Sequence, residues 1–271
     1  MRGPPIAGYQ GEPGAFSEDA ARQLVPGAET RGYPTFDDVA RAVAEREIEY
    51  AVLPVENSIS GPIPRVYDLL WLTEAIVVVA ERIYRVEQTL IGVPGSTLAT
   101  LREVRSHPVA LEQCRALLAT HPEWRATIVA DTAGAVREIV ELADPSVAAI
   151  ASTLAAERYR ATVLRTNVQD RADNFTRFFL LRRSDRSDAL APAAEPSRAC
   201  IALSLANRAG SLRDALASFA DRGLDLRSIV SRPTDVAFTY RFYLEIASAG
   251  PEALAAALAE IDGTVRVMGH Y

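Results

Sequence analysis

The segment 173–181 combines polar side chains with a strongly apolar stretch. Its sequence, DNFTRFFLL, places Thr176 and Arg177 among phenylalanines and leucines. Aromatic and aliphatic residues that follow the turn-forming run 170–174 predict a β-strand. A hydroxyl and a guanidinium surrounded by so much apolar surface need hydrogen-bonding partners. On this segment alone, the simpler interpretation is a structural strand, with Thr176 as a β-former and Arg177 at a sheet edge. Whether these two residues have a functional role has to be judged from the rest of the chain.

A second group of polar residues follows the short apolar run 50–53. This run predicts a buried strand, and the segment after it contains Glu56, Asn57 and Ser58. Open α/β sheets bind ligands at the carboxyl ends of their strands. The segment is therefore a candidate ligand site, with an ordinary Asn/Ser/Gly turn as the open alternative.

Two predicted strand-to-helix turns could receive a carboxylate. The glycine-bearing loop 10–17 leads into a helix for which Ser17 is the expected N-cap. Ser106 is expected to cap a second helix over 109–120, with Pro108 in its first turn. Free backbone amides at helix starts attract anions. The first loop lacks the G-x-G-x-x-G spacing of a dinucleotide fold.

Composition excludes several classes of protein. The 271 residues are 49% hydrophobic and 24% charged, which is typical of a soluble globular protein. No apolar run approaches the roughly 18 residues of a membrane-spanning helix, and the first residues lack the apolar core of a signal peptide. We therefore expect a cytoplasmic protein with no membrane partner.

The net charge and the reactive side chains limit the partners and the reaction types that are possible for this protein. The net charge of −6 and the pI of about 5.3 argue against a nucleic-acid partner. All basic side chains are arginines, so Schiff-base chemistry on a lysine is excluded. Two distant cysteines, Cys114 and Cys200, and three scattered histidines predict neither a disulfide framework nor a metal site. We expect a mechanism without a metal or cofactor.

The order of predicted elements indicates an α/β fold. Strands alternate with helices over residues 1–183, which predicts mostly parallel sheets covered on both faces. A long strand from Ile76 to Val93 would connect two lobes, and Thr176 would lie near the cleft between them. The expected boundaries are 1–80 and 161–183 for lobe one and 81–160 for lobe two.

The remaining residues form a separate unit. Residues 184–197 are rich in Ser, Asp, Ala and Pro and predict a linker. Residues 198–271 predict the order β-α-β-β-α-β, which is ferredoxin-like. The expected strands are 199–205, 224–231, 239–247 and 264–268, and the expected helices are 210–222 and 251–261.

Taken together, the polar segments resemble those of prephenate dehydratases that carry an ACT regulatory domain. The similar segments occur in the family's order, and they are 11–17, 54–58, 106–108 with Gln113, and 174–178 in the first part, and 207–212 and 231–233 in the second. The resemblance implies a catalytic module of the type II periplasmic-binding-protein kind. It also implies decarboxylative dehydration of prephenate to phenylpyruvate in phenylalanine biosynthesis.

The same resemblance implies roles for particular residues. The catalytic candidates are Thr176, Asn57, Gln113, Ser106 and Glu56. The substrate-binding candidates are Gly11, Gly14, Ala15, Phe16, Ser58, His107, Pro108, Arg177 and Phe178. The effector-binding candidates are Asn207, Ala209, Gly210, Ser211, Leu212, Ser231, Arg232 and Pro233. The implied effector is L-phenylalanine, bound where ACT domains of a homodimer or homotetramer meet.

Elementary chemistry refines two of these roles. A threonine hydroxyl is too weak an acid for general acid catalysis near neutral pH, so Thr176 is expected to act as a fixed hydrogen-bond donor to the departing hydroxyl. Successive side chains of a strand face opposite ways. If Thr176 faces the cleft, Arg177 faces away, and an ion pair is expected for it in preference to a substrate carboxylate.

Three alternatives remain open at this stage. Val230 stands where the family usually has glutamate, which puts the strength of phenylalanine control in question. Arogenate dehydratases use the same scaffold, and the ammonium group of arogenate would seek a carboxylate such as Glu56. A non-catalytic amino-acid sensor would combine the same two parts.

Overall fold

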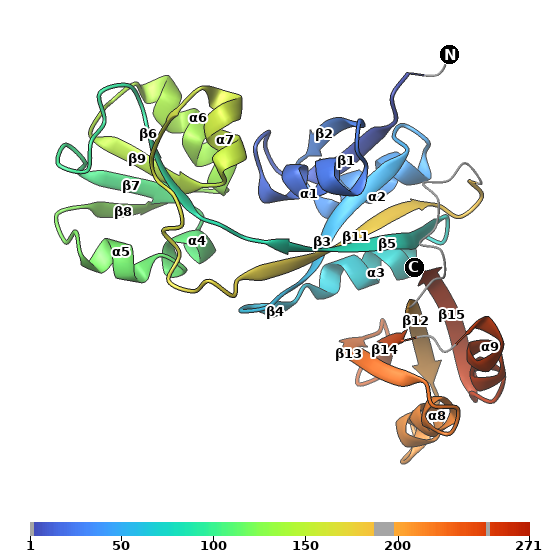
Figure 1. Ribbon diagram of the computed structural model, residues 1–271. Helices are drawn as coiled ribbons and strands as arrows, with labels where there is room; N and C mark the ends of the chain where they lie inside the picture. Colours follow the sequence, from blue (N-terminus) through green and yellow to red (C-terminus); the bar gives the residue numbers. More distant parts are fainter. Residues whose placement is uncertain (1–2, 187–197, 248–249) are drawn as a thin grey trace.

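The computed structural model describes residues 3–186, 198–247 and 250–271. They form a mixed α/β fold with two sheets (Figure 1). The larger sheet has the order β13-β14-β12-β15-β5-β11-β3-β1-β2, with β4 paired to β3. The smaller sheet has the order β10-β6-β9-β7-β8. In the described part of the chain, no helix is long and apolar enough to cross a membrane.

The first lobe is built on the β5-β11-β3-β1-β2 part of the larger sheet. Strands β1 and β2 and strands β1 and β3 pair in parallel, whereas β11 runs antiparallel between β3 and β5. Its strands are β1 (Ile6–Gln10), β2 (Glu29–Tyr33), β3 (Tyr50–Asn57), β4 (Gly61–Pro62), β5 (Ile76–Arg85) and β11 (Phe175–Arg183). Its helices are α1 (Phe16–Leu24), α2 (Phe36–Ala44) and α3 (Pro64–Leu72).

The second lobe is built on the smaller sheet. All five residues of its strand β9 are buried, as expected for a strand in a sheet that is covered on both faces. Its strands are β6 (Thr89–Gly92), β7 (Glu103–Ser106), β8 (Arg125–Ile128), β9 (Val147–Ala151) and β10 (Thr162–Arg165). Its helices are α4 (Pro108–Glu112), α5 (Arg115–Ala119), α6 (Thr132–Leu142) and α7 (Thr153–Tyr159).

The chain passes between the lobes twice, through residues 86–88 and 166–174. The expected continuous strand from Ile76 to Val93 is interrupted at 86–88, because the two crossing segments bond to each other: Val86 N donates to Asn174 O at 2.8 Å, and Val168 N donates to Gln88 O at 2.9 Å. Strand β10 pairs with β6 in the second lobe. The return crossing therefore follows residue 165, whereas it was expected at 161.

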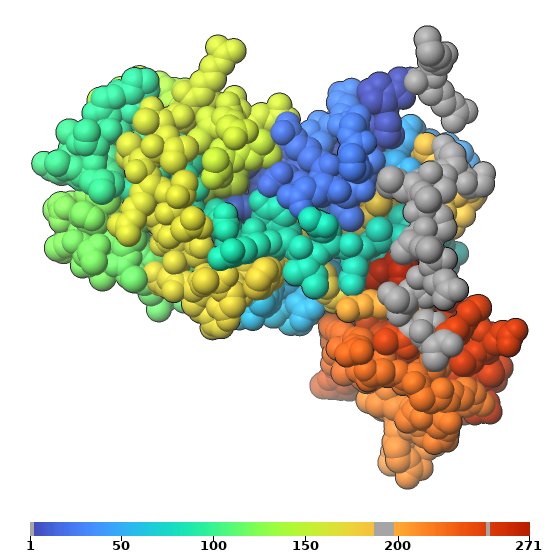
Figure 2. Space-filling view, viewed as in Figure 1, coloured from blue at the N-terminus to red at the C-terminus, as the bar shows by residue number. Residues whose placement is uncertain are grey.

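The C-terminal unit follows the predicted order of elements. It consists of β12 (Arg198–Leu205), α8 (Ser211–Ala220), β13 (Asp225–Pro233), β14 (Tyr240–Ala247), α9 (Pro251–Ala259) and β15 (Gly263–His270). One parallel pair, Gly269 with Val78, joins its sheet to that of the first lobe. Figure 2 shows this unit, orange to red, on the side of the first lobe that faces away from the second. Residues 187–197 of the predicted linker lie outside the described residues.

Several local predictions need correction. Helix α1 begins at Phe16 with Ala15 as its N-cap, so Ser17 is not the cap. The helix expected over 109–120 is divided at Gln113 and Cys114 into α4 and α5, and its cap is His107, whose Nδ1 accepts from Val109 N at 3.3 Å. Strand β2 and helix α3 were not predicted.

Candidate active site

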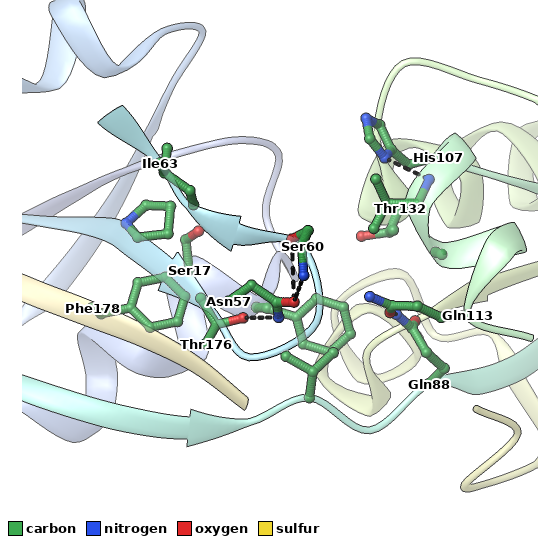
Figure 3. A pocket seen from close by; sticks show the side chains of 15 residues that line it. Ser17, Asn57, Ser60, Ile63, Gln88, His107, Gln113, Thr132, Thr176 and Phe178 are labelled. Carbon is green, nitrogen blue, oxygen red and sulfur yellow. Dashed lines mark hydrogen bonds between the residues drawn. The ribbon is translucent and has the colours of Figure 1, made fainter. Parts of the chain in front are cut away.

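A cleft of about 230 Å³ lies between the two lobes (Figure 3). Both lobes and the first crossing segment contribute to its wall, so its shape depends on how the lobes meet. It is lined by Phe16, Ser17, Pro54, Asn57, Ser60, Ile63, Val86, Gln88, His107, Val109, Ala110, Gln113, Thr132, Thr176 and Phe178. Pockets for drug-sized ligands begin at roughly 300 Å³, so this smaller volume suits a ligand below that size.

Asn57 holds Thr176 at the floor of the cleft. The two residues face each other at the ends of β3 and β11. Asn57 Nδ2 donates to Thr176 Oγ1 at 3.0 Å, and Asn57 Oδ1 accepts from the backbone amides of Ile59 and Ser60, both at 3.0 Å. Because the Asn57 amide already donates to the Thr176 oxygen, the hydroxyl hydrogen of Thr176 is free to point elsewhere. Thr176 can therefore donate to a molecule in the cleft.

Gln113 reaches the cleft from the opposite lobe (Figure 3). It lies at the break between α4 and α5. Its Oε1 accepts from Asn174 Nδ2 at 2.9 Å and from Gln88 Nε2 at 3.1 Å. Both donors lie in the crossing segments, so the same residues that connect the lobes also orient Gln113.

Arg177 points away from the cleft into a cluster of carboxylates. It donates to Glu81 Oε2 at 3.0 Å, to Glu56 Oε2 at 3.0 and 3.2 Å, and to both oxygens of Glu245 on β14 of the C-terminal unit. Burial alone would lower the pKa of Arg177, but the hydrogen bonds and charge of Glu245 outweigh it and raise that pKa. The guanidinium therefore stays charged and is engaged in ion pairs, as strand alternation suggested.

The lobes also touch along one rim of the cleft. Ser152 Oγ donates to Gly14 O at 2.5 Å, and Arg158 of α7 pairs with the fully buried Glu18 of α1. Gly14 has a φ of +93°, and a Cβ there would lie 2.6 Å from Ala155 Cα, so only glycine fits. The two lobes are therefore joined directly at this rim, beside the crossing segments.

The predicted site residues divide into three groups. Thr176, Asn57, Gln113, Phe16, His107 and Phe178 line the cleft. Ser58 and Glu56 lie just outside it: Ser58 Oγ bonds to Asp173 O at 2.8 Å and to Phe175 N at 2.9 Å, and Glu56 pairs with Arg177. Gly11, Gly14, Ala15, Pro108 and Arg177 belong to the surrounding framework and not to the cleft wall.

Ser106 requires a correction. It is the last residue of β7, it is fully buried, and its Oγ donates to Ile150 O at 2.6 Å. It ties β7 to the neighbouring β9 instead of capping a helix at the cleft, because the helix begins two residues later and His107 takes the capping position.

Nine residues of the wall were not among the predicted site residues, and three of them with polar side chains are Thr132, Ser60 and Gln88. Thr132 follows β8 at the start of α6, and the rule about carboxyl ends of strands could have found it. Ser60 donates its Oγ to Asn57 Oδ1 at 3.2 Å. Gln88 lies in a crossing segment, where no local pattern marks it as part of a site.

The cleft wall in the described residues carries no arginine side chain. Two helices of the wall, α1 and α6, begin at the cleft, and the first amides of a helix have no intrahelical partner. Cys114 lies next to Gln113, but burial raises the pKa of its thiol to about 12 and makes it a poor nucleophile. No group of side chains suited to a metal ion occurs in the ranges that the structure describes. Of these two helix starts, α6 is already capped by the Asp131 carboxylate, so the start of α1 is the one that offers free amides to an anionic group.

A second, smaller hollow of about 110 Å³ lies in the C-terminal unit. The predicted effector residues Asn207, Ser211 and Leu212 line it, together with Leu205, Ala206, Arg208, Thr239, Tyr240 and Phe242. Ala209 and Gly210 lie in the same loop but do not line the hollow. Ser231, Arg232 and Pro233 form the end of β13, where Arg232 pairs with Asp68 of α3 at 2.7 Å.

Comparisons with known proteins agree with this geometry. A model of the prephenate dehydratase family matches residues 7–186. The chain is 36% identical to a bifunctional N-acyl-homoserine lactone acylase/prephenate dehydratase of Komagataeibacter europaeus, over 97% of this chain and 92% of that protein. It is 35% identical to the chloroplastic arogenate dehydratase/prephenate dehydratase 1 of Arabidopsis thaliana, over 97% and 71%.

Among solved structures, the prephenate dehydratase of Arthrobacter aurescens in complex with L-Phe superimposes with a TM-score of 0.86 at 27% identity, over 98% of this chain and 89% of that one. The matched family region contains Thr176, Asn57 and Gln113 and thus the whole cleft. This chain belongs to the prephenate dehydratase family.

Proposed function

We propose that this protein converts prephenate to phenylpyruvate, water and carbon dioxide. The observation that carries the proposal is the pair Asn57–Thr176, which leaves a hydroxyl hydrogen free to point into the cleft. Loss of the carboxylate and of the ring hydroxyl makes the substrate ring aromatic, so the product supplies the driving force. The protein has to orient a dicarboxylate and stabilise the hydroxyl as it departs.

Thr176 is proposed to donate to that departing hydroxyl. A fixed donor of this kind contributes roughly 2.7–4 kcal/mol to the transition state when it acts as in an oxyanion hole. A substrate carboxylate would be held by backbone amides at the start of α1, near Ser17, because the Asp131 carboxylate already caps α6 by accepting from Gly134 N at 2.6 Å. The amide of Val109 is already bonded to the ring of His107, so the start of α4 contributes less than expected.

Arogenate is the second candidate substrate. Relatives at 35–38% identity are named arogenate dehydratases. Glu56 pairs with Arg177 and does not line the cleft, so it is not placed to meet an ammonium group bound there.

The domain division and regulation are part of the same proposal. Residues 1–183 would form the catalytic domain and residues 198–271 an ACT domain that binds L-phenylalanine in the hollow around Asn207 and Ser211. The relative solved with L-Phe supports this effector. Large exposed side chains beside this hollow, Val236, Phe238 and Tyr240, support association of two such units in a homodimer or homotetramer. A cytoplasmic location remains a prediction.

The test is a parallel assay of wild-type protein and Thr176→Val with prephenate and with arogenate, each with and without L-phenylalanine. We expect the wild type to form phenylpyruvate from prephenate and the variant to turn over about 100-fold more slowly or worse, with an unchanged thermal midpoint. Phenylalanine formed from arogenate alone would move the assignment to the second candidate. Near-wild-type turnover by the valine variant would refute the role of Thr176.

A further inference from the structure

Four carboxamide side chains form one hydrogen-bonded chain from the first lobe to the second. Asn57 Nδ2 donates to Asn174 Oδ1 at 2.9 Å, and Asn174 Nδ2 donates to Gln113 Oε1 at 2.9 Å. Gln88 Nε2 donates to the same oxygen of Gln113 at 3.1 Å. In a carboxamide, only the nitrogen donates and only the oxygen accepts. The orientation of one member therefore determines the orientation of the next.

The orientation is set at the Asn57 end by the backbone. The amides of Ile59 and Ser60 can only donate, so the atom of Asn57 that faces them must be its oxygen. Its nitrogen then faces Asn174, which must turn its oxygen toward Asn57 and its nitrogen toward Gln113. Gln113 in turn must present its oxygen to Asn174, which leaves its Nε2 for the cleft.

Gln88 gives a separate indication that the orientation of the Gln113 amide is determined by its neighbours. The residue is only 2% exposed, and its Oε1 has no hydrogen-bond partner among the described residues. A buried acceptor without a partner is unfavourable. Rotating the Gln88 amide would not relieve it, because that oxygen would then face the oxygen of Gln113. The orientation of Gln113 therefore holds despite a cost at Gln88.

We propose that Asn174 is a positioning residue for the reaction. It transmits the backbone-determined orientation of Asn57 to Gln113, so that the cleft presents two donors to its ligand, the Thr176 hydroxyl and the Gln113 amide. An anionic substrate that loses hydroxide needs donors at both places. This inference rests on the proposed function, because its kinetic test uses that substrate.

The kinetic test is the near-isosteric variant Asn174→Asp. Its carboxylate still accepts from Asn57 but cannot donate to Gln113, so the Gln113 amide is expected to rotate and turn its oxygen into the cleft. We expect kcat/KM for prephenate to fall about 10- to 100-fold, the range for loss of one hydrogen bond to a charged group. The double variant Asn174→Asp/Gln113→Ala should be no slower than Gln113→Ala alone, because Asn174 acts through Gln113.

Gln23→Glu is the control, since it adds the same charge by the same amide-to-carboxylate change at an exposed position of α1 and should retain wild-type kcat/KM. Asn174→Asp activity within about threefold of wild type, or a double variant slower by the product of the two single effects, would overturn the inference. Absence of wild-type turnover would instead count against the proposed function. For that case, neutron diffraction of the unliganded wild type decides independently: deuterons of Gln113 facing the cleft support the inference, and deuterons facing Asn174 refute it.

Discussion

Replacing Glu245 by glutamine should weaken the attachment of the C-terminal unit to the first lobe. Glu245 is 1% exposed. Its Oε1 accepts from Tyr67 at 2.6 Å and from Arg177 Nη2 at 2.7 Å, and its Oε2 accepts from Arg177 Nη1 and, at 3.3 Å, from Tyr271. Glutamine keeps one acceptor and replaces the other with an NH₂ group. One donor of the buried guanidinium or of a tyrosine would then face another donor.

The magnitude follows from the remaining partners of Arg177. Removing one member of a buried ion pair costs about 3–5 kcal/mol, and Glu56 and Glu81 still face Arg177, so we expect about 3 kcal/mol. At roughly 2–4 °C per kcal/mol, the thermal midpoint should fall by about 6–12 °C. Thermal unfolding followed by circular dichroism measures this shift.

Glu157→Gln on the exposed face of α7 removes the same charge and is the control, with an expected shift below about 1 °C. If Glu245→Gln shifts the midpoint no more than this control does, the ion-pair cluster does not hold the two units together and the reasoning fails.

Two further predictions concern the contact between the lobes. Gly14→Ala should lower kcat/KM by about 5- to 160-fold, because the new Cβ would meet the Ala155 backbone and backbone strain of this kind costs about 1–3 kcal/mol. Steady-state kinetics measures this loss, and Gly27→Ala, with φ +81° and no atom within 4 Å, is the control for the backbone effect alone. For Glu18, burial alone would raise the pKa, but hydrogen bonds from Arg158, the Gly14 amide and Thr30 outweigh it and lower that pKa. The stabilisation by Glu18 is thus present above its unfolded pKa of about 4.3 and is lost as the pH falls through the lower folded pKa. The thermal midpoint of Glu18→Gln should be lower than that of wild type at pH 7 and should fall less on acidification. Parallel plots of midpoint against pH for the two proteins would contradict this.

Sequence patterns predicted correctly those structural features that depend only on residues close together in the chain. The alternation of a strand was enough to put Thr176 and Arg177 on opposite faces of β11, and periodicity was enough to predict the order of elements in the C-terminal unit. The carboxylates around Arg177 could not be predicted, because Glu56, Glu81 and Glu245 come from three distant strands. Gln88 was missed for a related reason, since only the path of the chain between the lobes brings it to the cleft.

The crossing segments both connect the lobes and hold two of the four linked carboxamides. Asn174 lies in one crossing segment and Gln88 in the other, while Asn57 and Gln113 belong to opposite lobes. If the lobes swing apart to admit substrate or release product, the chain of amides must break at one of its links, and Gln113 loses its fixed direction. The two donors of the cleft are thus aligned only while the lobes keep the mutual arrangement that this hydrogen-bonded chain spans.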